Sequence, residues 1–125
     1  MLFRSHSTVD AISHAVCAMA IDVGAKAIVA CSLSGGTVRM ISRFRAPVDI
    51  LGVTTSEQTM RKLALSWGVM PAMSVEYTST DVLFYVATQL AREKLGLQSG
   101  DKIVITGGVT NGKSGNTNLI KVEVI

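Results

Sequence analysis

The stretch CSLSGGTVRM, residues 31–40, places hydroxyl side chains and two adjacent glycines directly after the apolar run AIVA. If that run ends a buried strand and a helix starts near Gly36, then Ser32, Ser34, Thr37, backbone N–H groups and the positive end of the helix dipole share one concavity. Glycine there lets the backbone approach a ligand closely. The chemistry that this pattern favours is the binding of phosphate or sulfate.

The same segment has a plainer interpretation. Gly35 and Gly36 could form a tight turn between strand and helix, with Ser34 or Thr37 as the helix N-cap, and a short glycine loop alone does not decide between the two. The stretch matches neither G-x-x-x-x-G-K-[ST] nor G-x-G-x-x-G. Chemistry on nucleoside triphosphates is therefore not expected.

A second glycine-rich stretch, residues 107–116, follows an apolar strand pattern and contains Lys113. Its plainer interpretation is a hairpin loop whose lysine points to water. In a doubly wound sheet of strand order 3-2-1-4-5, strands one and four are neighbours, and ligands bind beyond the carboxyl ends of the strands where the order reverses. We therefore expect the two glycine loops to line one crevice.

No catalytic constellation accompanies these loops. The sequence has no His-x-x-His or Cys-x-x-Cys pair, no paired loop carboxylates and no serine elbow with a positioned histidine. His6 and His14 are expected in a solvated tail and on a helix surface. Asp81, Glu93 and Asp101 are expected as helix caps and surface charges. We expect the chain alone to catalyse nothing.

The composition fits one globular domain, because 48% of the 125 residues are hydrophobic and 17% are charged. A net charge of +3, with only 5% aromatic residues, suits a small anion and argues against nucleic acid. Cys17 and Cys31 lie in apolar patterns and are expected as buried, reduced thiols. No targeting segment or membrane-length apolar run is present, so we expect a cytoplasmic protein without membrane contact.

Hydrophobic periodicity predicts strands alternating with helices. The predicted helices are residues 10–23, 36–45, 56–68 and 80–96, and the predicted strands are residues 26–31, 50–55, 69–77, 102–107 and 117–125. Pro71 weakens the third strand, which could start only after it. The last connection is too short for a crossover helix, so the final two strands should be antiparallel. We predict a three-layer α/β/α fold with a mixed five-stranded sheet of order 3-2-1-4-5.

Local signals predict where the helices start and stop. The expected N-terminal signals are Asp10, then Thr54 with Glu57 or Thr55 with Gln58, and Ser79 or Thr80. Gly24 is expected just past the first helix. In the second helix, Val38, Ile41 and Ser42 are expected to face inward, and Arg39, Arg43 and Arg45 outward.

The order strand, S-G-x-T loop, helix, R-F-R-A-P and I-L-G-V-T-T, followed near the end by S-G-x-T-N-L-I-K-V, is specific. Through these motifs, residues 9–125 resemble the C-terminal domain of pyruvate kinase, whereas residues 1–8 match poorly and are treated as a tail. The resemblance implies a three-layer α/β fold that carries an allosteric effector site and contributes subunit contacts. The family's magnesium and potassium bind a barrel domain that this sequence does not contain, so no cofactor is expected here.

The resemblance also implies the residues of the effector site. The phosphate would lie on Ser32, Leu33, Ser34, Gly35, Gly36 and Thr37, and a sugar phosphate such as fructose 1,6-bisphosphate would be covered by Gly112, Lys113, Ser114, Gly115, Asn116 and Thr117. Leu33 and Gly36 stand where family members often carry a cation. The phosphate would therefore depend on backbone N–H groups and Lys113.

We expect a regulatory domain that binds a phosphorylated effector or sulfate. A function of another class stays open, in which the pocket is vestigial and the domain is an assembly module that forms a homo-oligomer through a helix face and the edge strand 117–125. A third possibility is the C-terminal piece of a split or truncated pyruvate kinase, which would be active only with a barrel domain as its partner.

Overall fold

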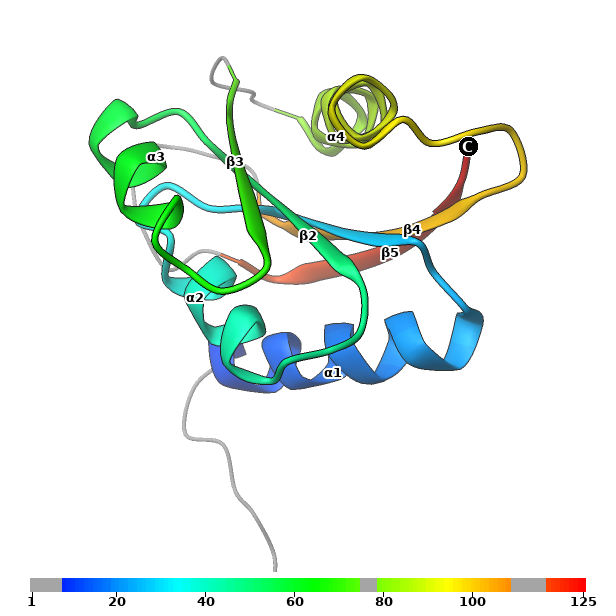
Figure 1. Ribbon diagram of the computed structural model, residues 1–125, viewed down its shortest axis with the longest axis horizontal. Helices are drawn as coiled ribbons and strands as arrows, with labels where there is room; N and C mark the ends of the chain where they lie inside the picture. Colours follow the sequence, from blue (N-terminus) through cyan, green and yellow to red (C-terminus); the bar gives the residue numbers. More distant parts are fainter. Residues whose placement is uncertain (1–7, 75–78, 109–116) are drawn as a thin grey trace, which may run out of the picture.

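The computed structural model describes residues 8–74, 79–108 and 117–125. In chain order the elements are α1 (Thr8–Val23), β1 (Ala27–Cys31), α2 (Gly36–Arg43), β2 (Asp49–Thr54), α3 (Glu57–Leu63), β3 (Val69–Met73), α4 (Thr80–Leu95), β4 (Lys102–Gly107) and β5 (Leu119–Val124). Figure 1 shows the sheet between two helical layers, with α1 and α2 on one face and α4 on the other. The predicted alternation of strands and helices is confirmed.

The sheet has the order β3-β2-β1-β4-β5, as predicted. The pairs β1–β2, β1–β4 and β2–β3 are parallel, and β4–β5 is antiparallel. From β1 the chain moves outward to β2 and β3 and then crosses back to place β4 on the other side of β1. The strand order therefore reverses between β1 and β4, which is the position where doubly wound sheets bind ligands.

The central strands are buried on both faces, which explains their continuous apolar runs. All five residues of β1 are buried. Ile28 and Ala30 pack in the core under α1 and α2, whereas Val29 faces the core under α4. Both cysteines are buried, as predicted, and burial raises the pKa of the Cys17 thiol above its ordinary value.

Two of the predicted helix starts are wrong. Helix α1 begins at Thr8, so Asp10 lies in its first turn and is not its N-cap. Helix α3 is capped by Ser56, whose Oγ accepts a hydrogen bond from the Thr59 N–H at 3.2 Å. Thr54 is not the cap, because its Oγ1 accepts from the Ser56 N–H at 3.1 Å, before the helix begins. The same hydroxyl donates to the Leu33 carbonyl at 3.2 Å, so it links the start of α3 to the loop after β1.

Helix α3 is also shorter than predicted, because it ends at Leu63 and not near Gly68. The N–H groups of Leu65 and Ser66 bond to carbonyls three residues back, which tightens the chain into a turn before β3 begins at Val69. Strand β3 includes Pro71, contrary to the possibility that it starts after it. Proline fits there because β3 is an edge strand, whose outer side needs no N–H donor.

The predicted signals for α4, for the end of α1 and for the buried face of α2 are confirmed. Ser79 caps α4 by accepting from the Val82 N–H at 3.3 Å, and Gly96 ends that helix with φ +63°. Gly24 follows α1 with φ +68°. Val38, Ile41 and Ser42 of α2 are buried.

We predict that Ser56→Ala lowers the free energy of unfolding by about 1 kcal/mol, because α3 loses its N-cap hydrogen bond. The matched control is Thr55→Ala, which should change it by less than about 0.5 kcal/mol. Urea unfolding followed by circular dichroism measures both. Equal losses in the two variants would contradict the assignment of Ser56 as the cap.

Candidate functional site

The loop between β1 and α2 is held in shape by its own hydroxyl groups. Ser32 Oγ accepts a hydrogen bond from the Gly35 N–H at 3.0 Å, and Ser34 Oγ accepts one from the Gly36 N–H at 3.4 Å. The Arg39 guanidinium donates to the Ser34 carbonyl at 3.1 Å. Together with the Thr54 bond to Leu33, these contacts fix the loop from both ends.

The N-terminus of α2 lies at the end of this loop. Its N-cap is Gly35, in a left-handed conformation with φ 82° and ψ 3°, and no side chain within the described residues caps it. Neither Ser34 nor Thr37 is the N-cap, so that part of the plainer interpretation is wrong. The side-chain acceptors that the described residues place near the positive end of the helix dipole are the Ser32 and Ser34 hydroxyls, which accept from the Gly35 and Gly36 N–H groups.

The two adjacent glycines serve different purposes. A Cβ on Gly35 would lie 3.0 Å from Thr59 Cγ2 and 3.1 Å from Leu63 Cδ2, so the fold itself requires glycine there. A Cβ on Gly36 would meet only Ser34 Oγ among the described atoms, at 3.6 Å, and Gly36 has no positive φ. Neither packing nor backbone conformation demands glycine at position 36. Because Gly36 has no side chain, the described atoms leave space over the start of α2.

The loops after β1 and β4 meet through a buried hydroxyl pair. Thr37 Oγ1 and Thr117 Oγ1 are 2.9 Å apart, and the two residues are only 3% and 4% exposed. The start of β5 is held beside β4 by the Asn118 N–H, which donates to the Gly107 carbonyl at 3.0 Å. The N-terminus of α2 and the end of the β4–β5 loop therefore lie together at the reversal of strand order.

The predicted site residues differ in their exposure to solvent. Gly35 and Thr37 are buried, Ser32, Leu33 and Gly36 are half-buried, and Ser34 is exposed. Thr117 joins them through Thr37. Gly112, Lys113, Ser114, Gly115 and Asn116 lie outside the described residues, so their contribution stays a prediction.

Sequence reasoning missed two supports of this site. Thr54 braces the Leu33 carbonyl from β2, and Arg39 braces the Ser34 carbonyl from the first turns of α2. The role of Thr54 could have been predicted, because a threonine at the end of a parallel strand can reach the loop that follows the neighbouring strand. The capping-box spacing of Thr54 and Glu57 favoured another interpretation of the same residue. The role of Arg39 could not have been predicted, because an exposed helical arginine predicts only solvent contact.

The described residues offer hydrogen-bond donors and hydroxyls but no metal site. Nowhere in ranges 8–74, 79–108 and 117–125 do three or more His, Cys, Asp or Glu side chains gather as metal ligands would. His14 is exposed on α1, as predicted, and its ring contacts that of Phe44. No helix in the described part of the chain is long and apolar enough to cross a membrane. The arrangement is suited to holding an anion.

The fold is an α/β domain in which the β1–α2 loop and the end of the β4–β5 loop meet where the strand order reverses. The family described as "Pyruvate kinase, alpha/beta domain" matches residues 10–123, and the chain therefore belongs to this family.

Full-length relatives agree with the family match. The chain is 40% identical over 119 residues to a pyruvate kinase of Clostridium acetobutylicum and 41% identical over 119 residues to one of Staphylococcus aureus strain USA300. These matches cover 95% of this chain but only 25% and 20% of the two relatives. The chain thus spans about a quarter or less of the length of these proteins.

The contrast between the two glycines makes a stability prediction. Gly35→Ala should lower the free energy of unfolding by about 1–3 kcal/mol, because it adds both overpacking and strain at positive φ. Gly36→Ala should cause no loss and could add up to about 1 kcal/mol, since alanine is the better helix residue. Denaturant unfolding measures both values. A loss on Gly36→Ala as large as that on Gly35→Ala would show that packing requires both glycines.

Proposed function

We propose that this chain is a regulatory domain of the pyruvate kinase type, which binds a phosphorylated small molecule where the β1–α2 and β4–β5 loops meet and has no catalytic site of its own. The observation that carries the proposal is the buried Thr37–Thr117 contact beside the start of α2, whose N-cap Gly35 has no side chain. It joins the residues of two loops that are 80 positions apart in the sequence.

A phosphate group fits the chemistry of this junction. A helix N-terminus offers backbone N–H donors and a positive dipole end, which bind anions without any side-chain charge. Open space at Gly36 lets a phosphate oxygen approach the backbone closely. The hydroxyls of Ser32 and Ser34 already organise the N–H groups of Gly35 and Gly36, so the loop is shaped before a ligand arrives.

The second loop would distinguish one phosphorylated compound from another. The resemblance to pyruvate kinases assigns Gly112 to Asn116 to the cover over a sugar, and Lys113 adds a cation that the first loop lacks. Thr117, at the end of that loop, touches Thr37 directly, so a ligand that binds the second loop would also act on the first turn of α2. A sugar phosphate such as fructose 1,6-bisphosphate is the ligand class we propose.

An assembly module is the second candidate, and the edge strand β5 favours it. In the described sheet β5 pairs with β4 alone, and Val122 and Val124 are 37% and 59% exposed. A second copy of the chain could extend the sheet at this edge. The Lys121–Glu123 ion pair at 2.9 Å places charges on the same strand, which opposes unspecific pairing.

Thermal unfolding in the presence of fructose 1,6-bisphosphate, glucose 6-phosphate, ribose 5-phosphate and sulfate tests the proposal. A ligand of the site should raise the midpoint, because at 100 times its dissociation constant it adds about 2.7 kcal/mol to the free energy of unfolding. Thr37→Val removes one hydroxyl of the buried pair at nearly constant volume and should abolish most of that rise. Lys113→Met should weaken it as well.

The matched control is Thr55→Val, a threonine outside both loops, which should keep the full ligand-induced rise. A folded protein whose midpoint responds to none of the four compounds would contradict effector binding. If the same protein sediments as a dimer that dissociates on Val124→Lys, the assembly module is the better description.

A further inference from the structure

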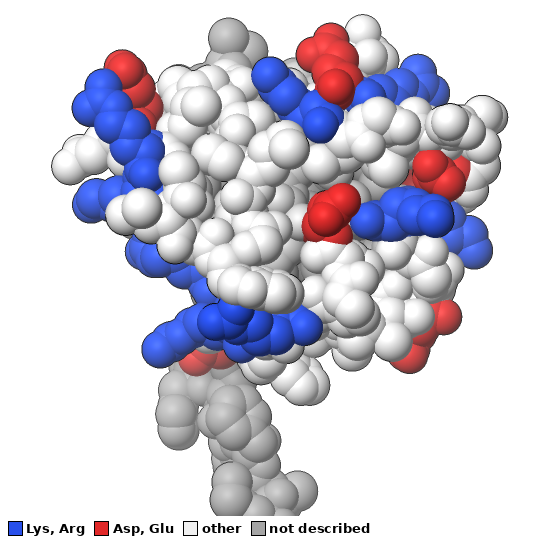
Figure 2. Space-filling view, viewed as in Figure 1, with Lys and Arg blue, Asp and Glu red and all other residues white. Residues whose placement is uncertain are grey.

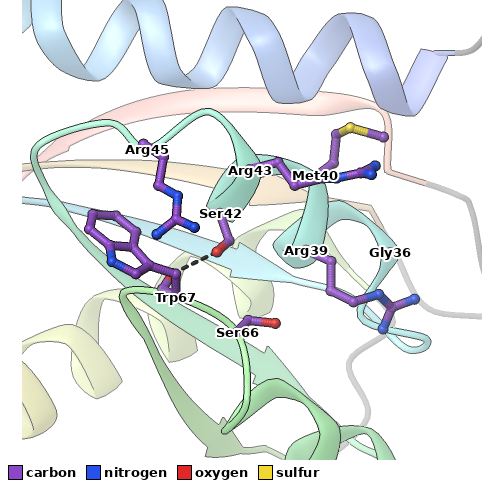
Figure 3. Close-up of a pocket in the computed structure, with 8 residues that line it drawn as sticks. All are labelled: Gly36, Arg39, Met40, Ser42, Arg43, Arg45, Ser66 and Trp67. Carbon is purple, nitrogen blue, oxygen red and sulfur yellow. Dashed lines mark hydrogen bonds between the residues drawn. The ribbon is translucent and has the colours of Figure 1, made fainter.

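A groove beside the loop junction runs along the outer face of α2. It has a volume of about 510 Å³ and lies between α2 and the turn that joins α3 to β3. Its lining includes Gly36, Arg39, Met40, Arg43, Arg45 and Trp67. We call it the arginine groove. Figure 3 shows Arg45 and Trp67 at one end and Gly36 and Arg39 at the other.

The groove is cationic. Arg39, Arg43 and Arg45 are exposed, and none of the lining residues is acidic. Figure 2 shows Lys and Arg side chains running down the side of the molecule that carries α3 and α2.

One end of the groove is built for a flat ring. The Arg45 guanidinium carbon lies 4.5 Å from the centroid of the Trp67 ring, and Trp67 is 51% exposed. The Trp67 carbonyl accepts a 2.6 Å hydrogen bond from Ser42 Oγ, which ties the α3–β3 turn to α2. Arginine and indole planes held in this way offer stacking surfaces for an aromatic ligand.

The backbone of Arg45 has an unfavourable left-handed conformation. Arg45 is the one described residue other than glycine with positive φ, at 53°. Glycine or asparagine would adopt this conformation more easily. The Arg45 guanidinium lies over the Trp67 ring, and both residues line the groove.

We propose that the arginine groove binds a nucleotide, with its base against Arg45 and Trp67 and its phosphates against Arg43 and Arg39. From Gly36 to Arg43 the helix rises about 10 Å, which is the scale of a base, a ribose and a phosphate in extended form. Guanidinium groups bind phosphate oxygens in bidentate fashion, and they stack on aromatic rings. The groove supplies both contacts.

The volume of the groove favours a small ligand over an acidic protein partner. Small-molecule sites have volumes of roughly 300–1,000 Å³, and the groove lies within this range. The groove shares Gly36 and Arg39 with the loop after β1, whereas Thr37 and Thr117 of the proposed effector junction do not line it.

The test uses the chain's own fluorescence, because Trp67 is its only tryptophan. Titration with ADP should quench Trp67 saturably. Pyrophosphate and adenosine, which each supply half of the contacts, should bind at least about tenfold more weakly than ADP. Arg43→Met should weaken ADP binding by about tenfold or more, the loss expected for one charge-assisted contact.

Arg45→Gly separates a loss of binding from a loss of folding. Glycine suits the positive φ, so this variant should be at least as stable as the wild type while its affinity for ADP falls by about tenfold or more. Arg92→Met, an exposed arginine on α4, is the matched control and should leave ADP binding unchanged. Thr37→Val should also leave it unchanged, which separates this site from the effector junction.

Three outcomes would overturn the proposal. They are no saturable quenching by ADP, quenching that survives both arginine substitutions, and pyrophosphate binding as tightly as ADP. Equal binding of pyrophosphate and ADP would show that the groove recognises the charge of the phosphates and not the base. A groove that binds no nucleotide but whose Arg43→Met and Arg45→Gly variants lose binding to an acidic protein segment would be a protein-docking surface instead.

Discussion

The parallel pairing of β1 with β4 is the constraint on which the candidate site depends. The register from Ala27↔Ile103 to Ala30↔Thr106 brings the ends of both strands to the same edge of the sheet. The fit is close there, because a Cβ on Gly107 would lie 3.1 Å from Cys31 Cβ and 3.3 Å from the Cys31 carbonyl oxygen. Without this pairing, Thr37 and Thr117 could not meet, and the two glycine loops would be unrelated turns.

The sequence predicted most of the fold because the strands and helices differ in hydrophobic period. The run AIVAC is apolar throughout since both of its faces are covered, and the α2 pattern separates buried Val38 and Ile41 from exposed arginines. The predicted meeting of the loops followed from strand order alone. Strand order does not say which side chains of the two loops touch, and no local pattern predicted the pair of Thr37 and Thr117 hydroxyls.

The predicted cap of α3 was wrong because the folded chain decides which hydroxyl faces the first turn of a helix. Thr54 has the type and spacing of a helix cap, but it accepts from the Ser56 N–H and donates to the Leu33 carbonyl, whereas Ser56 accepts from the Thr59 N–H within α3. The arginine groove was missed for a related reason. It depends on where the α3–β3 turn places Trp67, and that position is set by the early end of α3 and by the bond from Ser42.

The central claim is that a phosphate group binds at the start of α2 and beside Thr117, and amide chemical shifts test it most directly. We would titrate the ¹⁵N-labelled chain with fructose 1,6-bisphosphate. Binding at the junction predicts saturable shifts of the Gly36, Thr37 and Thr117 amides with one common dissociation constant. Unchanged amides at these three positions in a folded protein, or shifts confined to residues around Trp67, would contradict the claim.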